Sequence, residues 1–222
     1  MRATNGREAI LRAARDTFAS KGFDGASIRD IAQAADLSLS ALYYYFSSKQ
    51  DALYELVSAS YERFNAHSRQ VIAAAGDDHA QRVAALVRYL VRFRIANPEI
   101  SRVVLRDTER LTPDRFARLH ELQKESRGLL LDIVRAGEAA GEFAVVDAAL
   151  ASRSILAICN AIPLWYRPGG DITPEDLERT YTLHALRILG CAEPGAGDLE
   201  RLFAQPVPTG ETRLSPDDPD GP

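Results

Sequence analysis

Residues 27–46 have the sequence SIRDIAQAADLSLSALYYYF. Ser27 can cap the first turn of a helix, and Asp30 completes a capping-box pattern three residues later. A short turn at residues 36–38 leads into a second short helix that ends near Phe46. Two short helices joined by a tight turn predict a helix-turn-helix unit.

The rest of the chain has the apolar spacing of an all-α protein. Apolar residues return every three or four positions, and no stretch alternates as a strand does. A first helix precedes the helix-turn-helix unit and stops at Gly22. Downstream, capping residues, prolines and glycines predict helices at about 49–74, 80–96, 99–110, 113–141, 147–166 and 174–190.

These elements predict two helical domains and a tail. We expect a three-helix domain at residues 1–50 that contains the helix-turn-helix unit, and a larger helical domain at residues 51–190. The tail, residues 191–222, holds six of the eleven prolines and little apolar periodicity. We therefore expect the tail to be disordered.

The composition is that of an ordinary soluble protein, with 46% hydrophobic and 26% charged residues. We expect no membrane span, because the longest apolar runs are much shorter than the roughly 18 residues that a span needs. We also expect no signal peptide at the N-terminus. Cys159 and Cys191 have neither metal-site nor disulfide spacing, which predicts a cytoplasmic protein with no metal and no cofactor.

Charge and motif content narrow the function classes. The formal net charge is −4, but residues 1–50 carry an excess of basic residues, and affinity for nucleic acid depends on local charge. The four histidines are dispersed, and neither a glycine-rich phosphate loop nor a nucleophile elbow occurs. The sequence therefore gives no support for an enzyme.

The second helix of the helix-turn-helix unit has an unusual outer face. Leu42 and Phe46 lie four residues apart and are expected to point inward with Leu37. The side chains expected to lie largely outside are Ser38, Leu39, Ala41, Tyr43, Tyr44 and Tyr45. Phenol hydroxyls can reach phosphates, and small residues let a helix enter a major groove about 12 Å wide. Spacing alone leaves two interpretations open, a DNA interface or a set of partly buried aromatic residues.

Residues 7–55 carry a pattern that extends beyond these two helices. The pattern consists of Gly22-Phe23, Ile31-Ala32, Leu42-Tyr43-Tyr44-Tyr45-Phe46, Lys49 and Leu53. It resembles the N-terminal domain of TetR-family regulators. The resemblance implies an all-helical two-domain chain, with a DNA-binding domain at residues 1–50 and a domain for effector binding and dimerisation at residues 51–190. It also implies a homodimer on double-stranded operator DNA, and repression that a small ligand relieves.

By position, the resemblance also implies which residues contact the operator. Ser27 and Arg29 match contacts from the second helix, and Lys49 matches a lysine that contacts a phosphate. The contacts from the recognition helix match Ser38, Leu39, Ser40, Ala41, Tyr43, Tyr44 and Tyr45.

Two positions depart from the family pattern. Asp36 stands where glycine is usual, and Leu39 stands where a polar or basic residue is common, so the bases that are read stay open.

The last two long helices, at about 147–166 and 174–190, are apolar on more than one face. A helix that packs on one side needs one apolar stripe, so we expect the second stripe to pair with the same helices of another copy. A symmetric dimer also suits DNA, because two recognition helices must reach half-sites about 34–36 Å apart. The alternative is a monomer that buries both faces internally.

The interior of residues 80–166 is where TetR-family regulators keep their effector pocket. The apolar residues that we predict to line such a pocket are Tyr89, Phe93, Leu105, Phe116, Leu122, Ile155, Cys159, Ile162 and Trp165. An ordinary core is the alternative for each of them, because apolar periodicity does not separate the two. Pro163 interrupts a helical pattern and predicts a kink beside Trp165.

Residues 164–175 are similar to the C-terminal domains of TetR-type regulators of fatty-acid and steroid degradation, which respond to acyl-CoA thioesters. The arginines that could meet the phosphates of such a ligand are spaced four apart: Arg102, Arg106 and Arg110, and Arg88 with Arg92. Solvated helix faces are the alternative. The sequence thus predicts a repressor released by a hydrophobic effector such as an acyl-CoA thioester. A drug-like or aromatic effector, or DNA binding without an effector, are the competing hypotheses.

Overall fold

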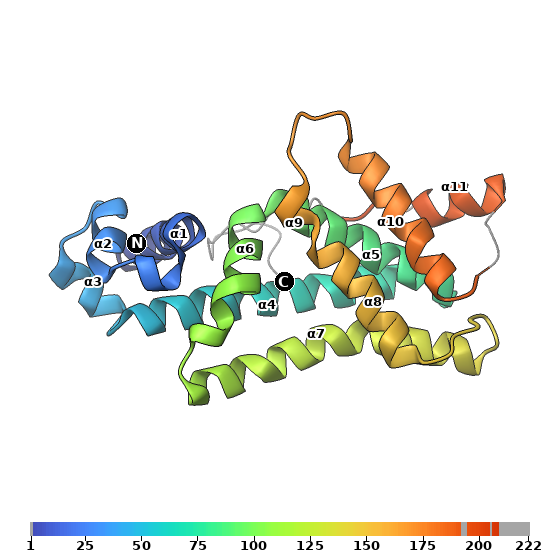
Figure 1. The fold of residues 1–222 in the computed structure, drawn as a ribbon, viewed down its shortest axis with the longest axis horizontal. Coiled ribbons are helices and arrows are strands. Elements are labelled where there is room, and N and C mark those ends of the chain that lie inside the picture. Colours follow the sequence, from blue (N-terminus) through green and yellow to red (C-terminus); the bar gives the residue numbers. More distant parts are fainter. Residues whose placement is uncertain (1, 192–194, 205, 209–222) are drawn as a thin grey trace. The chain divides into compact units, whose positions relative to one another are not determined.

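The computed structural model describes residues 2–191, 195–204 and 206–208, and no strand occurs among them. The helices in chain order are α1 (Arg2–Gly25), α2 (Ile28–Ala34), α3 (Leu39–Tyr45), α4 (Lys49–Ala74), α5 (His79–Ala96), α6 (Pro98–Asp107), α7 (Pro113–Ala139), α8 (Ala148–Asn160), α9 (Ile162–Trp165), α10 (Pro174–Ile188) and α11 (Ala196–Ala204) (Figure 1). A 3₁₀ turn covers Thr108–Arg110. The all-α prediction is confirmed.

The chain divides into two compact units, each with its own core. Unit 1 contains the described residues up to Glu62 together with Glu99–Leu122. Unit 2 contains Arg63–Pro98 and the described residues from Gln123 onward. This division differs from the boundary expected at residue 50. The difference arises because most of α6 and the start of α7 share one apolar core with α1, α2 and α3.

Unit 1 owes its helix boundaries to local residue chemistry. In α1, Ile10, Leu11, Ala14 and Phe18 form one apolar stripe, which is buried in the core of this unit. Gly22 has a φ of 75° and a ψ of 164°, which interrupts the helical path where the sequence predicts a stop. The turn between α2 and α3 requires Asp36 at a φ of 54°, a left-handed conformation that Asp tolerates better than most residues.

Unit 2 is organised around α5, which is buried along most of its length. It packs against α8, α9, α10 and α11. The expected irregularity at Pro163 appears as a break: α8 ends at Asn160, and the short α9 begins at Ile162 with Pro163 in its first turn. Proline suits this position because its missing N–H would have no partner in the first turn of a helix.

The C-terminal segment differs from the disordered tail that the sequence predicts. Residues 196–204 form α11, and Leu202 and Val207 are buried. The backbone of the segment is held by α5, because Arg88 and Arg92 donate hydrogen bonds to the carbonyls of Leu202 and Val207. The rest of the predicted tail, residues 192–194, 205 and 209–222, lies outside the described residues.

Candidate nucleic-acid interface

The start of α2 is fixed by a reciprocal cap. The Ser27 hydroxyl oxygen accepts from the backbone N–H of Asp30 at 3.1 Å, and the Asp30 carboxylate accepts from the backbone N–H of Ser27 at 2.8 Å. Lys21 also donates to Asp30 at 2.8 Å. The hydrogen bonds from Lys21 and from Ser27 hold the pKa of the Asp30 carboxyl well below its usual range. The cap sets the direction of α2 and leaves the side chain of Arg29 exposed.

Helix α3 presents one apolar face to the core and one outer face. Leu42 and Phe46 are buried, as the spacing predicts. Ser38 caps the helix, because its hydroxyl accepts from the backbone N–H of Ala41 at 3.1 Å. Tyr43 and Tyr44 are 48% and 80% exposed, so both rings are free to meet a partner. Of the other predicted contact residues on α3, Ser40 is exposed, and Leu39 and Ala41 are half-buried.

Tyr45 differs from its two neighbours. It is half-buried and packs against the core of unit 1. A Cβ at Gly6 of α1 would stand only 2.9 Å from the Tyr45 hydroxyl, which places that hydroxyl against the α1 backbone. The rings of Tyr44 and Tyr45 meet edge to face, with centroids 5.0 Å apart. Two of the three consecutive tyrosines therefore form the outer surface, and the third supports it from behind.

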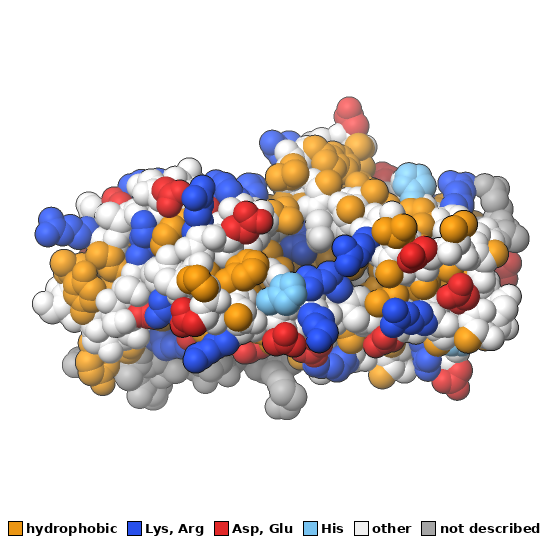
Figure 2. Space-filling model, turned by 60° about the horizontal axis from the view of Figure 1, so that its bottom comes forward, with side chains coloured by type: hydrophobic (Ala, Val, Ile, Leu, Met, Phe, Trp, Pro, Cys, Tyr) orange, Lys and Arg blue, Asp and Glu red, His pale blue; other side chains and the backbone are white. Residues whose placement is uncertain are grey.

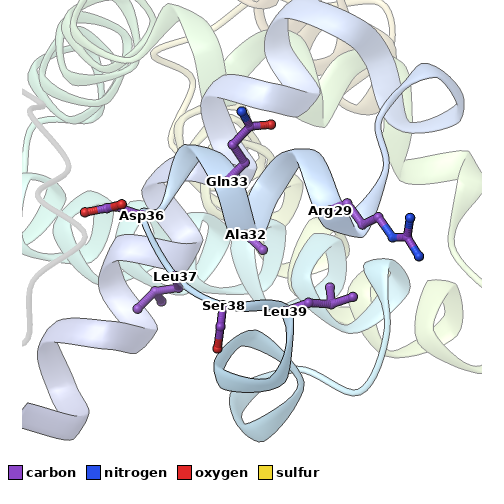
Figure 3. A pocket seen from close by; sticks show the side chains of 7 residues that line it. All are labelled: Arg29, Ala32, Gln33, Asp36, Leu37, Ser38 and Leu39. Carbon is purple, nitrogen blue, oxygen red and sulfur yellow. The ribbon is translucent and has the colours of Figure 1, made fainter.

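An open hollow of 610 Å³ lies between α2 and the start of α3. Its lining combines one basic, one acidic and one amide side chain with four small or apolar ones: Arg29, Asp36, Gln33, Ala32, Leu37, Ser38 and Leu39. In Figure 3, Arg29 and Leu39 extend to the same side of the pair of helices. Gln33 was not predicted as a contact, although its spacing of four residues from Arg29 puts the two on one face of α2. The hollow thus gathers predicted contact residues from both helices.

Lys49 does not extend freely from the start of α4. Its ammonium group donates to the carbonyls of Phe23 and Ala26, at 2.6 and 2.7 Å. It also lies 4.1 Å from the centroid of the Phe23 ring. A DNA phosphate would therefore have to compete with these internal partners for the Lys49 ammonium group.

The predicted effector residues fall into separate environments. Tyr89, Phe93, Cys159 and Ile162 are buried in the core of unit 2, and burial raises the pKa of the Cys159 thiol to about 12. Trp165 is 43% exposed. Among the other predicted lining residues, Ile155 is buried in unit 2, whereas Leu105, Phe116 and Leu122 belong to unit 1.

The predicted phosphate-binding arginines already have protein partners. Arg106 lies in unit 1, where it donates to both carboxylate oxygens of Asp107 and to the carbonyl of Phe18. A ligand phosphate would have to compete with these partners for Arg106. Arg102 pairs with Glu99, and Arg110 with Asp24. Arg88 and Arg92 pair with Glu178 instead of forming a solvated face.

Unit 2 has exposed apolar side chains on its last long helices. Leu150 of α8 and Leu164 of α9 are 63% and 62% exposed. Ile172, just before α10, and Ile188, the last residue of α10, are also exposed. Orange side chains gather over the region of α9 and α10 in the upper middle of Figure 2. The stretch Ala148–Trp165 is long and apolar enough to cross a membrane by length and composition, with a mean hydropathy of 1.4. The expectation of no membrane span was based on the length of uninterrupted apolar runs, and Arg153 and other polar residues shorten these runs here.

Comparison with known proteins covers both units. Residues 10–56 match the family model described as bacterial regulatory proteins, tetR family, and residues 76–189 match the tetracyclin repressor-like C-terminal domain. The chain is 29% identical over 190 residues to the HTH-type transcriptional repressor KstR2 of Rhodococcus jostii, covering 85% of this chain and 92% of the relative.

Two solved structures give the same architecture. The ketosteroid transcriptional regulator KstR2 of Mycobacterium tuberculosis superposes with a TM-score of 0.72 at 25% identity, over 83% of this chain and 93% of that chain. AibR, in complex with isovaleryl coenzyme A and operator DNA, superposes with a TM-score of 0.72 at 21% identity, over 84% of this chain and 100% of that chain. At that identity, the likeness to AibR concerns the fold.

Proposed function

The chain belongs to the TetR family of bacterial regulatory proteins, and from this premise we propose that it represses transcription by binding a palindromic operator as a homodimer. The observation that carries the proposal is the outer face of α2 and α3. There, Arg29, Ser40, Tyr43 and Tyr44 are exposed beside a hollow, on a frame of capped helices. Family members named repressors, such as KstR2, support the direction of regulation.

The chemistry of this face suits the major groove. Arg29 can neutralise a phosphate or donate two hydrogen bonds to a guanine edge, and the tyrosine hydroxyls can donate to phosphates. Leu39 carries no hydrogen-bonding group and would contact a thymine methyl group. Ser27 and Ser38 already use their hydroxyl oxygens as helix caps. They would therefore contribute by orienting the backbone N–H groups at the starts of α2 and α3 toward the DNA, and by accepting further hydrogen bonds with their remaining lone pairs. Ala41 would allow close approach of the helix.

The dimer would form through α8 and α10. Their exposed apolar side chains need a partner, and an isologous contact with a second copy supplies the same helices. A membrane is the competing partner for Ala148–Trp165. Leu150→Glu should convert the dimer to a monomer in analytical ultracentrifugation without loss of helicity. A protein that is monomeric before the change, or that sediments only with vesicles, would contradict the dimer.

For the effector, we propose a bulky hydrophobic compound bound in unit 2, with an acyl-CoA thioester as the leading class. The fold accommodates isovaleryl coenzyme A together with operator DNA in AibR, and KstR2 is named a ketosteroid regulator. Tyr89, Phe93 and Trp165 provide aromatic surface. The internal pairing of Arg88, Arg92 and Arg106 weakens the thioester hypothesis relative to an aromatic or drug-like compound, because a phosphate would have to compete with these partners.

The proposal is tested in two steps. Selection of bound sequences from a random duplex pool should yield one short palindrome, bound with a dissociation constant of about 10⁻⁸ M or tighter. Operator release is then measured with CoA thioesters, the matching free acids and unrelated hydrophobic compounds. A ligand shifts the equilibrium only if it binds the DNA-incompetent form better. Recovery of no preferred sequence would refute the repressor, and release by unrelated compounds alone would refute the thioester.

A further inference from the structure

The end of α1 is irregular, because Gly22 has non-helical φ and ψ just before the last helical turn. Only Ala26 and Ser27 separate the end of α1 from the first residue of α2. The carbonyl of Phe23 lies in the last turn of α1, and that of Ala26 follows the end of α1, directly before the N-cap residue Ser27. Carbonyls at the end of a helix need partners from elsewhere in the chain.

Lys49 supplies those partners from the start of α4. Its ammonium group has three N–H donors, and the carbonyls of Phe23 and Ala26 lie at 2.6 and 2.7 Å. The Phe23 ring adds a cation–π contact at 4.1 Å. The side chain is half-buried, so its position is defined by these contacts and by its own stem.

From this geometry we propose that Lys49 is a positioning residue for the operator-reading surface and not primarily a phosphate contact. It fixes the turn that leads into α2, and thereby the place of Ser27 and Arg29 relative to α3. The inference rests on the proposed function for its consequence on DNA, but the clamp itself is a property of the free protein. This allows the two to be tested separately.

The free-protein test is hydrogen exchange in the full chain carrying Lys49→Met, which keeps a long apolar stem and removes the donors. Backbone amides of residues 23–30 should exchange faster than in the wild type, and those of α3 should be unchanged. Arg110→Ala is the matched control, because Arg110 pairs with Asp24 of the same turn through exposed side chains alone. A pure phosphate contact predicts no change in exchange without DNA, and that result would overturn the proposal.

The operator test uses the slope of binding affinity against salt concentration. Loss of a charge-assisted clamp should weaken operator binding about 10- to 100-fold and leave the slope unaltered. Loss of a phosphate contact would instead make the slope shallower by about 0.9 per contact, or roughly two per dimer. A shallower slope with unchanged exchange in the free protein would refute the positioning role.

A measurement on the wild-type protein covers the case in which Lys49→Met does not fold. The clamp predicts slowly exchanging ammonium hydrogens for Lys49 in nuclear magnetic resonance spectra of the free protein, with little change when duplex is added. A signal that appears only in the presence of duplex would contradict it. If no operator is found at all, the exchange and ammonium measurements still show whether Lys49 holds the carbonyls of Phe23 and Ala26. In that case only the proposed function fails.

Discussion

Arg88 of α5 and Glu178 of α10 form an ion pair in the interior of unit 2, with Nε and Oε2 3.4 Å apart and only 5% and 3% of the two residues exposed. Burial lowers the pKa of Arg88, and the neighbouring carboxylate opposes that change. Arg92 donates to the other oxygen of Glu178. One buried carboxylate thus serves two arginines.

Glu178→Ala should therefore destabilise the protein by about 3 kcal/mol, because it leaves a buried arginine without its counter-charge. Urea unfolding followed by circular dichroism measures the change. Glu175→Ala on the exposed first turn of the same helix is the control and should cost less than about 1 kcal/mol. Equal effects of the two substitutions would mean that the pair contributes nothing in solution.

Truncation after residue 194 should also destabilise unit 2. It removes the carbonyls of Leu202 and Val207, which accept hydrogen bonds from Arg88 and Arg92. The expected loss is about 2–3 kcal/mol, since hydrogen bonds to charged groups are worth more than neutral ones. Truncation after residue 208 keeps both carbonyls and is the matched control. If both truncated proteins unfold at the same urea concentration as the full chain, α11 is not a structural part of unit 2.

This segment illustrates what sequence patterns leave undetermined. The proline content of residues 191–222 predicts disorder, whereas Leu202 and Val207 are buried. Periodicity describes each helix face by itself, so Arg88 and Arg92 fit a solvated face equally well. Their actual partners lie on elements 86 to 115 residues further along the chain. Such pairings depend on packing that no local pattern encodes.

Local chemistry, by contrast, predicted the frame of the helix-turn-helix unit well. The capping box of Ser27 and Asp30, the stop at Gly22 and the left-handed turn at Asp36 each depend on one to four neighbouring residues. The direction of Tyr45 was predicted less well, because its contact with α1 involves a residue far away in sequence.

The three tyrosines should therefore respond differently to substitution. Tyr43→Ala or Tyr44→Ala should weaken operator binding by about 1–3 kcal/mol, the usual loss for one good contact, with no change in unfolding. Tyr45→Ala should instead lower the free energy of unfolding by about 1–2 kcal/mol, less than for a fully buried aromatic side chain. Operator titration at fixed salt and urea unfolding separate the two effects. An unchanged affinity for both exposed tyrosines would show that the outer face of α3 does not read DNA.

The pH dependence of stability tests the cap of α2. Hydrogen bonds from Lys21 and Ser27 lower the pKa of Asp30 in the folded protein relative to its ordinary value of 3.8. A carboxyl whose pKa is lowered by folding stabilises the protein above its unfolded pKa, and this contribution is lost as the pH falls towards the folded pKa. The difference in stability between the wild type and Asp30→Asn should therefore be constant from about pH 7 to 5 and shrink steadily below about pH 4. Thermal unfolding of both proteins at each pH measures it. A difference that persists undiminished down to about pH 2.5 would show that the ionised carboxylate is not what holds the start of α2.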